Sequence, residues 1–180
     1  DPDGSDTDPC SNAFCGDEPL SEPETKAIAD WVKSIQANPD EPNILMSQDV
    51  HTYSQMWMFA YGEDCSAKVD NYDEQYEVAE SAVTAITKKY GTPFTYGDIC
   101  SIIYPSAGCN VDYFYEDPEI AIPFATTVEL RDDGNYGFLV PERYIREVAT
   151  EMYEGYVEQM AYIMEVEVPG LGLESCDRRK

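Results

Sequence analysis

Apolar residues recur every three or four positions in three parts of the chain, which predicts three amphipathic helices. The first follows the capping-box sequence of residues 21–24 and ends at Asn38-Pro39. The second covers residues 74–90 and ends at Gly91, and a long third helix opens at Pro141. The apolar positions of the three stripes are Ala27, Ile28, Trp31, Val32 and Ile35; Val78, Ala82, Val83 and Ile86; and Ile145, Val148, Met152, Val157, Met160 and Met164.

Two shorter segments have the length and composition of strands. Residues 43–50 form an apolar run that ends at His51, and residues 121–130 carry the β-branched and aromatic content of a buried strand. Because strands and helices alternate, we predict an α/β layered fold that forms one domain over residues 1–180. Residues 1–20 are predicted to be an acidic surface arm rather than a calcium loop, and residues 168–180 a loop-like tail.

Charge narrows the choice of partners. The chain of 180 residues is 43% hydrophobic, enough for a core, but carries 36 Asp and Glu against 11 Lys and Arg, a net charge of −25. Such a surface repels phosphate, which argues against nucleic acid and anionic membranes as partners. No apolar run approaches the length of about 18 residues that crosses a bilayer.

Six cysteines without a CxxC pair are typical of disulfides, and so of a secreted, extracellular protein. The chain starts with Asp1 rather than Met, so we expect it to be a processed or truncated product. Oxidised cysteines argue against a cysteine nucleophile, and the missing GxSxG elbow argues against a serine triad.

Two residues stand out as candidates for chemistry. His51 is the single histidine and follows an apolar strand; such a residue is either a structural hydrogen-bonding group or a ligand at a sheet edge. Glu129 lies inside an apolar strand, where an unpaired carboxylate is costly. Glu129 either pairs with Arg131, two positions on, or it serves a metal or a reaction, and spacing alone leaves both interpretations open.

Four blocks in order make the chain resemble the pancreatic-type zinc metallocarboxypeptidases. They read HTYSQ (51–55), IYPSAG (103–108), VDY (111–113) and ELRDDGNYGFLVP (129–141). The family writes them HSYSQ, IYxASG, IDW and ELRDTGRYGFLLP. The agreement runs from about Cys10 to about Ile163 and covers the second half of the family's catalytic domain. The resemblance therefore implies part of an α/β/α sandwich around a mixed, mostly parallel sheet.

The resemblance also assigns roles at the reaction centre. His51 corresponds to a zinc ligand, and Glu129 to the general base that acts on the attacking water. Tyr104 corresponds to the tyrosine that folds over the bound C-terminal residue. Tyr53 corresponds to a subsite contact, and Thr52 replaces a serine that contacts substrate through its carbonyl.

Val111 falls at the base of the family's specificity pocket, and Ile99 and Thr127 would line the same pocket. An apolar base implies preference for apolar or aromatic C-terminal residues, whereas Asp there implies Lys or Arg.

One expected zinc ion needs two further ligands, which the family takes from an upstream His-x-x-Glu that this chain lacks. We therefore expect the chain to be inactive without the upstream half, which also holds the substrate-binding arginines. Two rival interpretations are a non-catalytic peptide-binding relic and an acidic secreted structural module with Glu129 in an ion pair.

Some features depart from the family pattern or follow it only in one branch. The segment 116–123 is about three residues longer than usual and is expected to reshape the rim of the pocket. Cys109 replaces a small residue after Tyr104. The resemblance implies a Cys65–Cys100 disulfide, and gives Cys10 a partner upstream.

Overall fold

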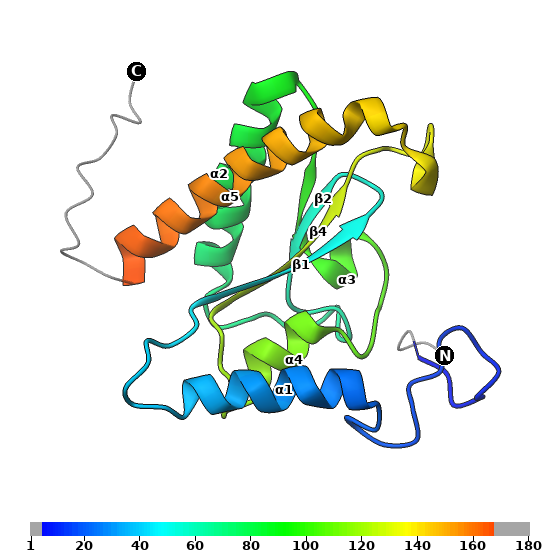
Figure 1. Ribbon diagram of the computed structural model, residues 1–180, viewed down its shortest axis with the longest axis vertical. Helices are drawn as coiled ribbons and strands as arrows, with labels where there is room; N and C mark the ends of the chain where they lie inside the picture. The colour runs from blue at the N-terminus through cyan, green and yellow to red at the C-terminus, as the bar shows by residue number, and fades with distance from the viewer. Residues whose placement is uncertain (1–4, 168–180) are drawn as a thin grey trace.

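The computed structural model describes residues 5–167, and the predicted tail from Val168 lies outside them. Helices and strands alternate along most of the chain (Figure 1). The elements are α1 (Pro23–Gln36), β1 (Met46–Thr52), β2 (Met56–Phe59), α2 (Tyr72–Tyr90), β3 (Thr95–Asp98), α3 (Ile99–Ile102), α4 (Asn110–Glu116), β4 (Phe124–Leu130) and α5 (Ile145–Glu167), with 3-10 turns at Gly137–Leu139 and Glu142–Tyr144.

The three predicted helices are present as α1, α2 and α5. Helix α2 ends as expected, because Gly91 adopts the left-handed conformation at φ 77° and donates its N–H to the Thr87 carbonyl. The capping box predicted for α1 is wrong: the N-cap residue is Glu22 and no side chain caps the helix. Helix α5 begins at Ile145, because the residues just after Pro141 form a 3-10 turn.

Both predicted strands are present: β1 is shifted toward the C-terminus, and β4 begins three residues later than predicted but ends at the predicted residue. β1 covers Met46–Thr52, so His51 lies within the strand and not after it. Four short elements have no clear sequence pattern and were not predicted: β2, β3, α3 and α4. The sheet order is β1-β4-β2-β3, with β1 parallel to β4, β2 parallel to β3, and β2 antiparallel to β4. The expected mixed, mostly parallel sheet is therefore confirmed.

Helices α2 and α5 lie together over one face of the sheet (Figure 1). That face of β4 carries Phe124, Thr126 and Val128, all buried. Phe124 packs with Val78 of α2 and Ile163 of α5. Val128 joins the larger hydrophobic cluster, to which both faces of the sheet contribute, so this face forms one part of the core.

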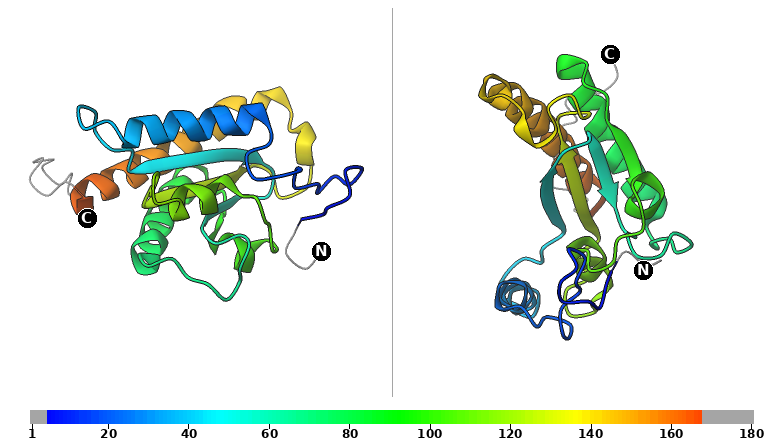
Figure 2. Two further views of the ribbon diagram at one scale, coloured as in Figure 1. Left: turned by 90° about the horizontal axis from the view of Figure 1, so that it is seen from below. Right: turned by 90° about the vertical axis from the view of Figure 1, so that its right-hand side faces the viewer.

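The opposite face of the sheet is covered by α4, beside which α1 runs (Figure 2). Lys33 of α1 joins the end of α4 through Asp117 at 2.7 Å and Glu119 at 2.9 Å. Because α4 covers only part of this face, the ends of β1 and β4 have room for a cavity.

The Cys65–Cys100 disulfide implied by the resemblance is present. It closes a loop with a sequence separation of 35, for which chain entropy gives a stabilisation of about 3–4 kcal/mol. Among the described residues Cys10, Cys15 and Cys109 form no disulfide. The upstream partner expected for Cys10 lies outside this chain, and Cys176 lies outside the described residues. Within residues 5–167 no helix combines the length and hydrophobicity needed to cross a bilayer.

Candidate functional site

The register of the sheet aligns the candidate residues in two rows on the face opposite α2 and α5. His51 of β1 lies opposite Glu129 of β4, and this pair forms the upper row. One row deeper, Asp49 of β1 lies opposite Thr127 of β4, which in turn lies opposite Met58 of β2. Side chains two apart on a strand share a face, so both rows open onto the same side of the sheet.

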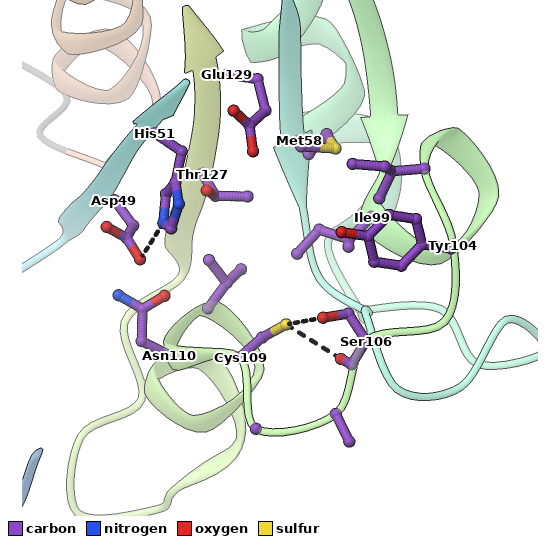
Figure 3. A pocket seen from close by; sticks show the side chains of 14 residues that line it. Asp49, His51, Met58, Ile99, Tyr104, Ser106, Cys109, Asn110, Thr127 and Glu129 are labelled. Carbon is purple, nitrogen blue, oxygen red and sulfur yellow. Dashed lines mark hydrogen bonds and ion pairs between the residues drawn. The ribbon is translucent and has the colours of Figure 1, made fainter. Parts of the chain in front are cut away.

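A cavity of about 350 Å³ opens above these rows (Figure 3). It brings together six residues that the sequence analysis singled out from four separate parts of the chain. They are His51, Ile99, Tyr104, Val111, Thr127 and Glu129.

The wall of the cavity that faces the two rows is apolar. Val111 on the first turn of α4 is 2% exposed and Ile99 at the start of α3 is 4% exposed, so both give a dry surface. Tyr104 lines the same cavity but is 60% exposed, which puts this ring where the cavity opens to solvent.

Glu129 does not form the ion pair with Arg131 that spacing allowed. Arg131 lies one residue beyond the end of β4, and its guanidinium instead binds Glu151 of α5, with Nε 2.6 Å from Oε1 and Nη2 2.6 Å from Oε2. Atom Oε2 of Glu129 is buried without a hydrogen-bond partner among the described residues. Burial raises the pKa of Glu129, His51 lowers it and the charge of Asp49 raises it further.

His51 contacts a carboxylate that the sequence analysis missed. Its Nε2 lies 2.8 Å from Oδ2 of Asp49, and both side chains are partly exposed (Figure 3). The spacing in the sequence already implied this neighbour, because a residue two positions before His51 on a strand must lie on the same face of the sheet as His51. The hydrogen bond on Nε2 leaves Nδ1 as the ring nitrogen with a lone pair for a ligand.

Two predicted subsite residues do not line this cavity. Thr52 borders a separate apolar hollow of about 610 Å³ beside α5. The Tyr53 ring packs edge-on against Phe138, with centroids 4.9 Å apart. It also lies against Gly137, where a Cβ would come within 3.2 Å of the ring and where φ is +58°, so only glycine fits.

The longer segment 116–123 does not reshape the rim of the cavity, because none of its residues lines it. The segment follows the C-terminal end of α4, away from Val111, and buries Ile120 and Ile122 in the core. That expectation was wrong.

Cys109 lines the cavity. Its thiol donates a hydrogen bond to the Ser106 carbonyl at 3.1 Å, and burial raises the pKa of this thiol.

The side chains at the cavity fit part of a zinc site. A neutral imidazole is a favoured zinc ligand, and the buried, unpaired oxygen of Glu129 shares its cavity. Within residues 5–167, however, no cluster of three or more His, Cys, Asp or Glu side chains is placed to hold a metal ion. These residues therefore place one imidazole and one unpaired carboxylate oxygen at the cavity, which is fewer than the three protein ligands of a catalytic zinc site.

Comparison with known proteins adds independent evidence. A family model described as zinc carboxypeptidase matches residues 1–155. Carboxypeptidase A2 of Mus musculus is 36% identical over 160 residues, which are 89% of this chain and 36% of that protein. A metallocarboxypeptidase A-like protein of Trichophyton verrucosum (strain HKI 0517) is 40% identical over 153 residues, 85% of this chain and 35% of that protein. The chain thus spans about a third of these relatives.

Solved structures agree with the sequence relatives. Bovine thrombin-activatable fibrinolysis inhibitor, solved in complex with tick carboxypeptidase inhibitor, superposes with a TM-score of 0.81 at 31% identity. The match covers 90% of this chain and 52% of that chain.

Proposed function

The chain belongs to the zinc carboxypeptidase family, and we propose that it supplies the base, one zinc ligand and the specificity pocket of a metallocarboxypeptidase. The substrates would be peptides and proteins, cleaved at the C-terminal peptide bond. The observation that carries this proposal is the pairing of His51 with Glu129 in the sheet register, above a cavity lined by Val111.

Zinc chemistry supplies Lewis-acid activation of water and of the scissile carbonyl when the ion is bound. His51 would hold the ion through its imidazole. Glu129 takes the proton from the attacking water and returns it to the leaving amine. The surroundings of Glu129 suit this role, since its raised pKa brings it closer to the working pH than an ordinary carboxylate.

Val111, Ile99 and Thr127 receive the C-terminal side chain, and Tyr104 closes over it. The buried apolar surface of Val111 and Ile99 favours apolar or aromatic C-terminal residues. Each fitted apolar group contributes about 1–3 kcal/mol, so the preference is graded rather than absolute. Tyr53 and Thr52 contact more distant parts of the peptide, consistent with their place outside the cavity.

Activity requires an upstream half of the domain, as the remainder of the same polypeptide or as a partner chain. Catalytic zinc normally keeps three protein ligands, and His51 is the one clear ligand among the described residues. The free edge of β1 fits this requirement, since β1 is an outer strand of the described sheet. The disulfide Cys65–Cys100 suits a secreted, extracellular enzyme.

The test compares this chain alone with its assembly with the upstream half. Zinc content and hydrolysis of peptides ending in Phe, Leu, Arg and Lys are measured for both. We expect zinc and activity only in the assembly, with Phe and Leu ahead, and Val111→Asp should narrow or reverse that order. Peptidase activity of the isolated 180 residues would overturn the requirement, and a zinc-loaded assembly that binds but never cleaves peptide would indicate a relic.

A further inference from the structure

We propose that Asp49 is a second specificity determinant, which lets the same cavity accept C-terminal Lys and Arg in addition to apolar residues. No sequence motif singled out Asp49. The inference rests on the proposed function, because it concerns the pocket that would receive the C-terminal side chain.

The sheet register assigns Asp49 to the pocket rather than to the reaction centre. Asp49 lies opposite Thr127, which lies opposite Met58, and all three line the cavity. His51 and Glu129 occupy the neighbouring row. Asp49 therefore contributes a carboxylate to the row that forms one side of the specificity pocket.

The two sides of the cavity suit the two parts of a long basic side chain. The apolar wall of Ile99 and Val111 matches the methylene stem of Lys or Arg. The opposite side carries Asp49 and Glu129, and no Lys or Arg is among the described residues that line the cavity. On this side of the cavity a cationic head group would therefore meet carboxylates, which attract it and repel acidic residues.

The depth of Asp49 matches the length of these side chains. Neighbouring rows on one face of a strand are separated by about 6.6 Å, twice the rise per residue. A substrate attacked beside Glu129 places its C-terminal Cα near the upper row. The four-carbon stem of Lys then carries the ammonium group toward the row of Asp49.

The contact between Asp49 and His51 leaves room for a cation. Oδ2 accepts the hydrogen bond from Nε2 of His51 at 2.8 Å. An ionised carboxylate has two oxygens and about four acceptor sites, so Oδ1 retains capacity for a guanidinium or ammonium group. Asp49 is also 39% exposed at its side chain, so a substrate can reach it.

The experiment uses the zinc-loaded assembly of the chain with its upstream half. kcat/KM is measured for matched peptides ending in Phe and in Arg, in wild type and in Asp49→Asn. We expect the Arg-to-Phe ratio to fall at least tenfold in the variant, whatever change the two values share. The ratio is the decisive quantity, since a change in zinc affinity or in the placement of His51 affects both peptides alike.

Asp30→Asn is the matched control, because Asp30 on α1 is an exposed aspartate whose charge pairs with Lys26. It removes the same charge outside the cavity and should leave the ratio unchanged. Asp49→Ser provides a second variant if the first does not fold, with the same expected loss of Arg hydrolysis.

The outcomes separate this inference from the proposed function. An unchanged Arg-to-Phe ratio of kcat/KM in the Asp49 variants overturns the inference about Asp49. This holds whether the two kcat/KM values fall together or neither falls. An equal change in Asp30→Asn also overturns it, because the effect then comes from net charge. No hydrolysis of the Phe peptide by wild type means that the proposed function itself has failed, and this inference with it.

Discussion

Two glutamates in the interior of this molecule have opposite surroundings. Glu151 on α5 is 1% exposed, and both its oxygens accept hydrogen bonds from Arg131, with Thr92 donating a further one at 2.8 Å. Glu129 on the pocket face of β4 has a buried oxygen without any partner among the described residues. Arg131 is only two residues from Glu129, yet its guanidinium binds the glutamate twenty residues away.

The difference teaches how to separate structural from functional carboxylates. A buried carboxylate that is fully hydrogen-bonded is compatible with a structural role, because its partners offset the cost of desolvation and removal of one partner is destabilising. A buried carboxylate that lacks partners costs stability and persists only where it serves another purpose. By this criterion Glu151 fastens α5 to the end of β4, and Glu129 is available for chemistry.

The largest expected effect is on turnover, which should distinguish Glu129 from Glu151. In the zinc-loaded assembly Glu129→Gln should lower kcat by about 10²–10⁴-fold, because the amide cannot accept the proton of water. Zinc content should stay the same, whereas His51→Ala should lose the metal. Turnover and metal content are measured side by side, and retained turnover in Glu129→Gln would remove Glu129 from its proposed role.

The second expected effect is on the free energy of unfolding, which should distinguish Glu151 from Glu129. Glu151→Gln should destabilise the assembly by about 3–5 kcal/mol, since it leaves the Arg131 charge largely buried without its counter-ion. Glu129→Gln should leave the unfolding midpoint nearly unchanged. Denaturant unfolding of both variants checks this, and equal losses of stability would abolish the distinction.

A third buried carboxylate sharpens the comparison. Asp112 on α4 accepts the Gly62 N–H at 3.0 Å and the Glu63 N–H at 3.1 Å, and burial still raises its pKa. Asp112→Asn replaces one accepting oxygen by a donor, which should cost about 1–3 kcal/mol. The same unfolding measurement checks it, and a loss as large as that of Glu151→Gln would show that a charged partner is not what matters.

The smallest effect concerns a partly exposed ion pair between α1 and the end of α4. Lys33 beside Asp117 lowers the pKa of that carboxyl, so the ion pair stabilises the fold above the unfolded-state pKa, and this contribution is lost as pH falls through the lowered value. Asp117→Asn should therefore reduce stability less than Asp112→Asn at pH 7. The reduction should shrink further toward pH 3. Thermal unfolding at both pH values measures it, and a reduction that grew at low pH would contradict this account.

Much of the fold was predictable because long periodic segments dominate it. α1, α2 and α5 follow from apolar spacing, and β4 from its β-branched composition. β2 was missed because four residues are too few to show a period, although Trp57 and Phe59 are fully buried. Its strand character comes from pairing with β3 and β4, which are distant in sequence.

The residues that form the candidate site could be predicted from the sequence, but the contacts between their side chains could not. Motifs located His51, Tyr104, Val111 and Glu129, and these residues meet at one cavity, while their chemical roles stay predictions. The partner of Arg131 depends on the packing of α5, which local spacing does not encode. The place of Asp49 in the pocket depends on the register of two strands, β1 and β4, that are distant in the sequence.

The pairing of β1 with β4 has a consequence for how this protein tolerates changes of length. Inserting or deleting one residue in β1 before His51 would turn His51 and Asp49 to the face packed by α2 and α5, so the reaction centre and the pocket would disappear together. A change of length in the turn after α4, outside the buried Ile120 and Ile122, would leave this register intact, and none of the turn's residues lines the cavity. Lineages of this protein should therefore vary in length at that turn and keep the residue count of β1 unchanged.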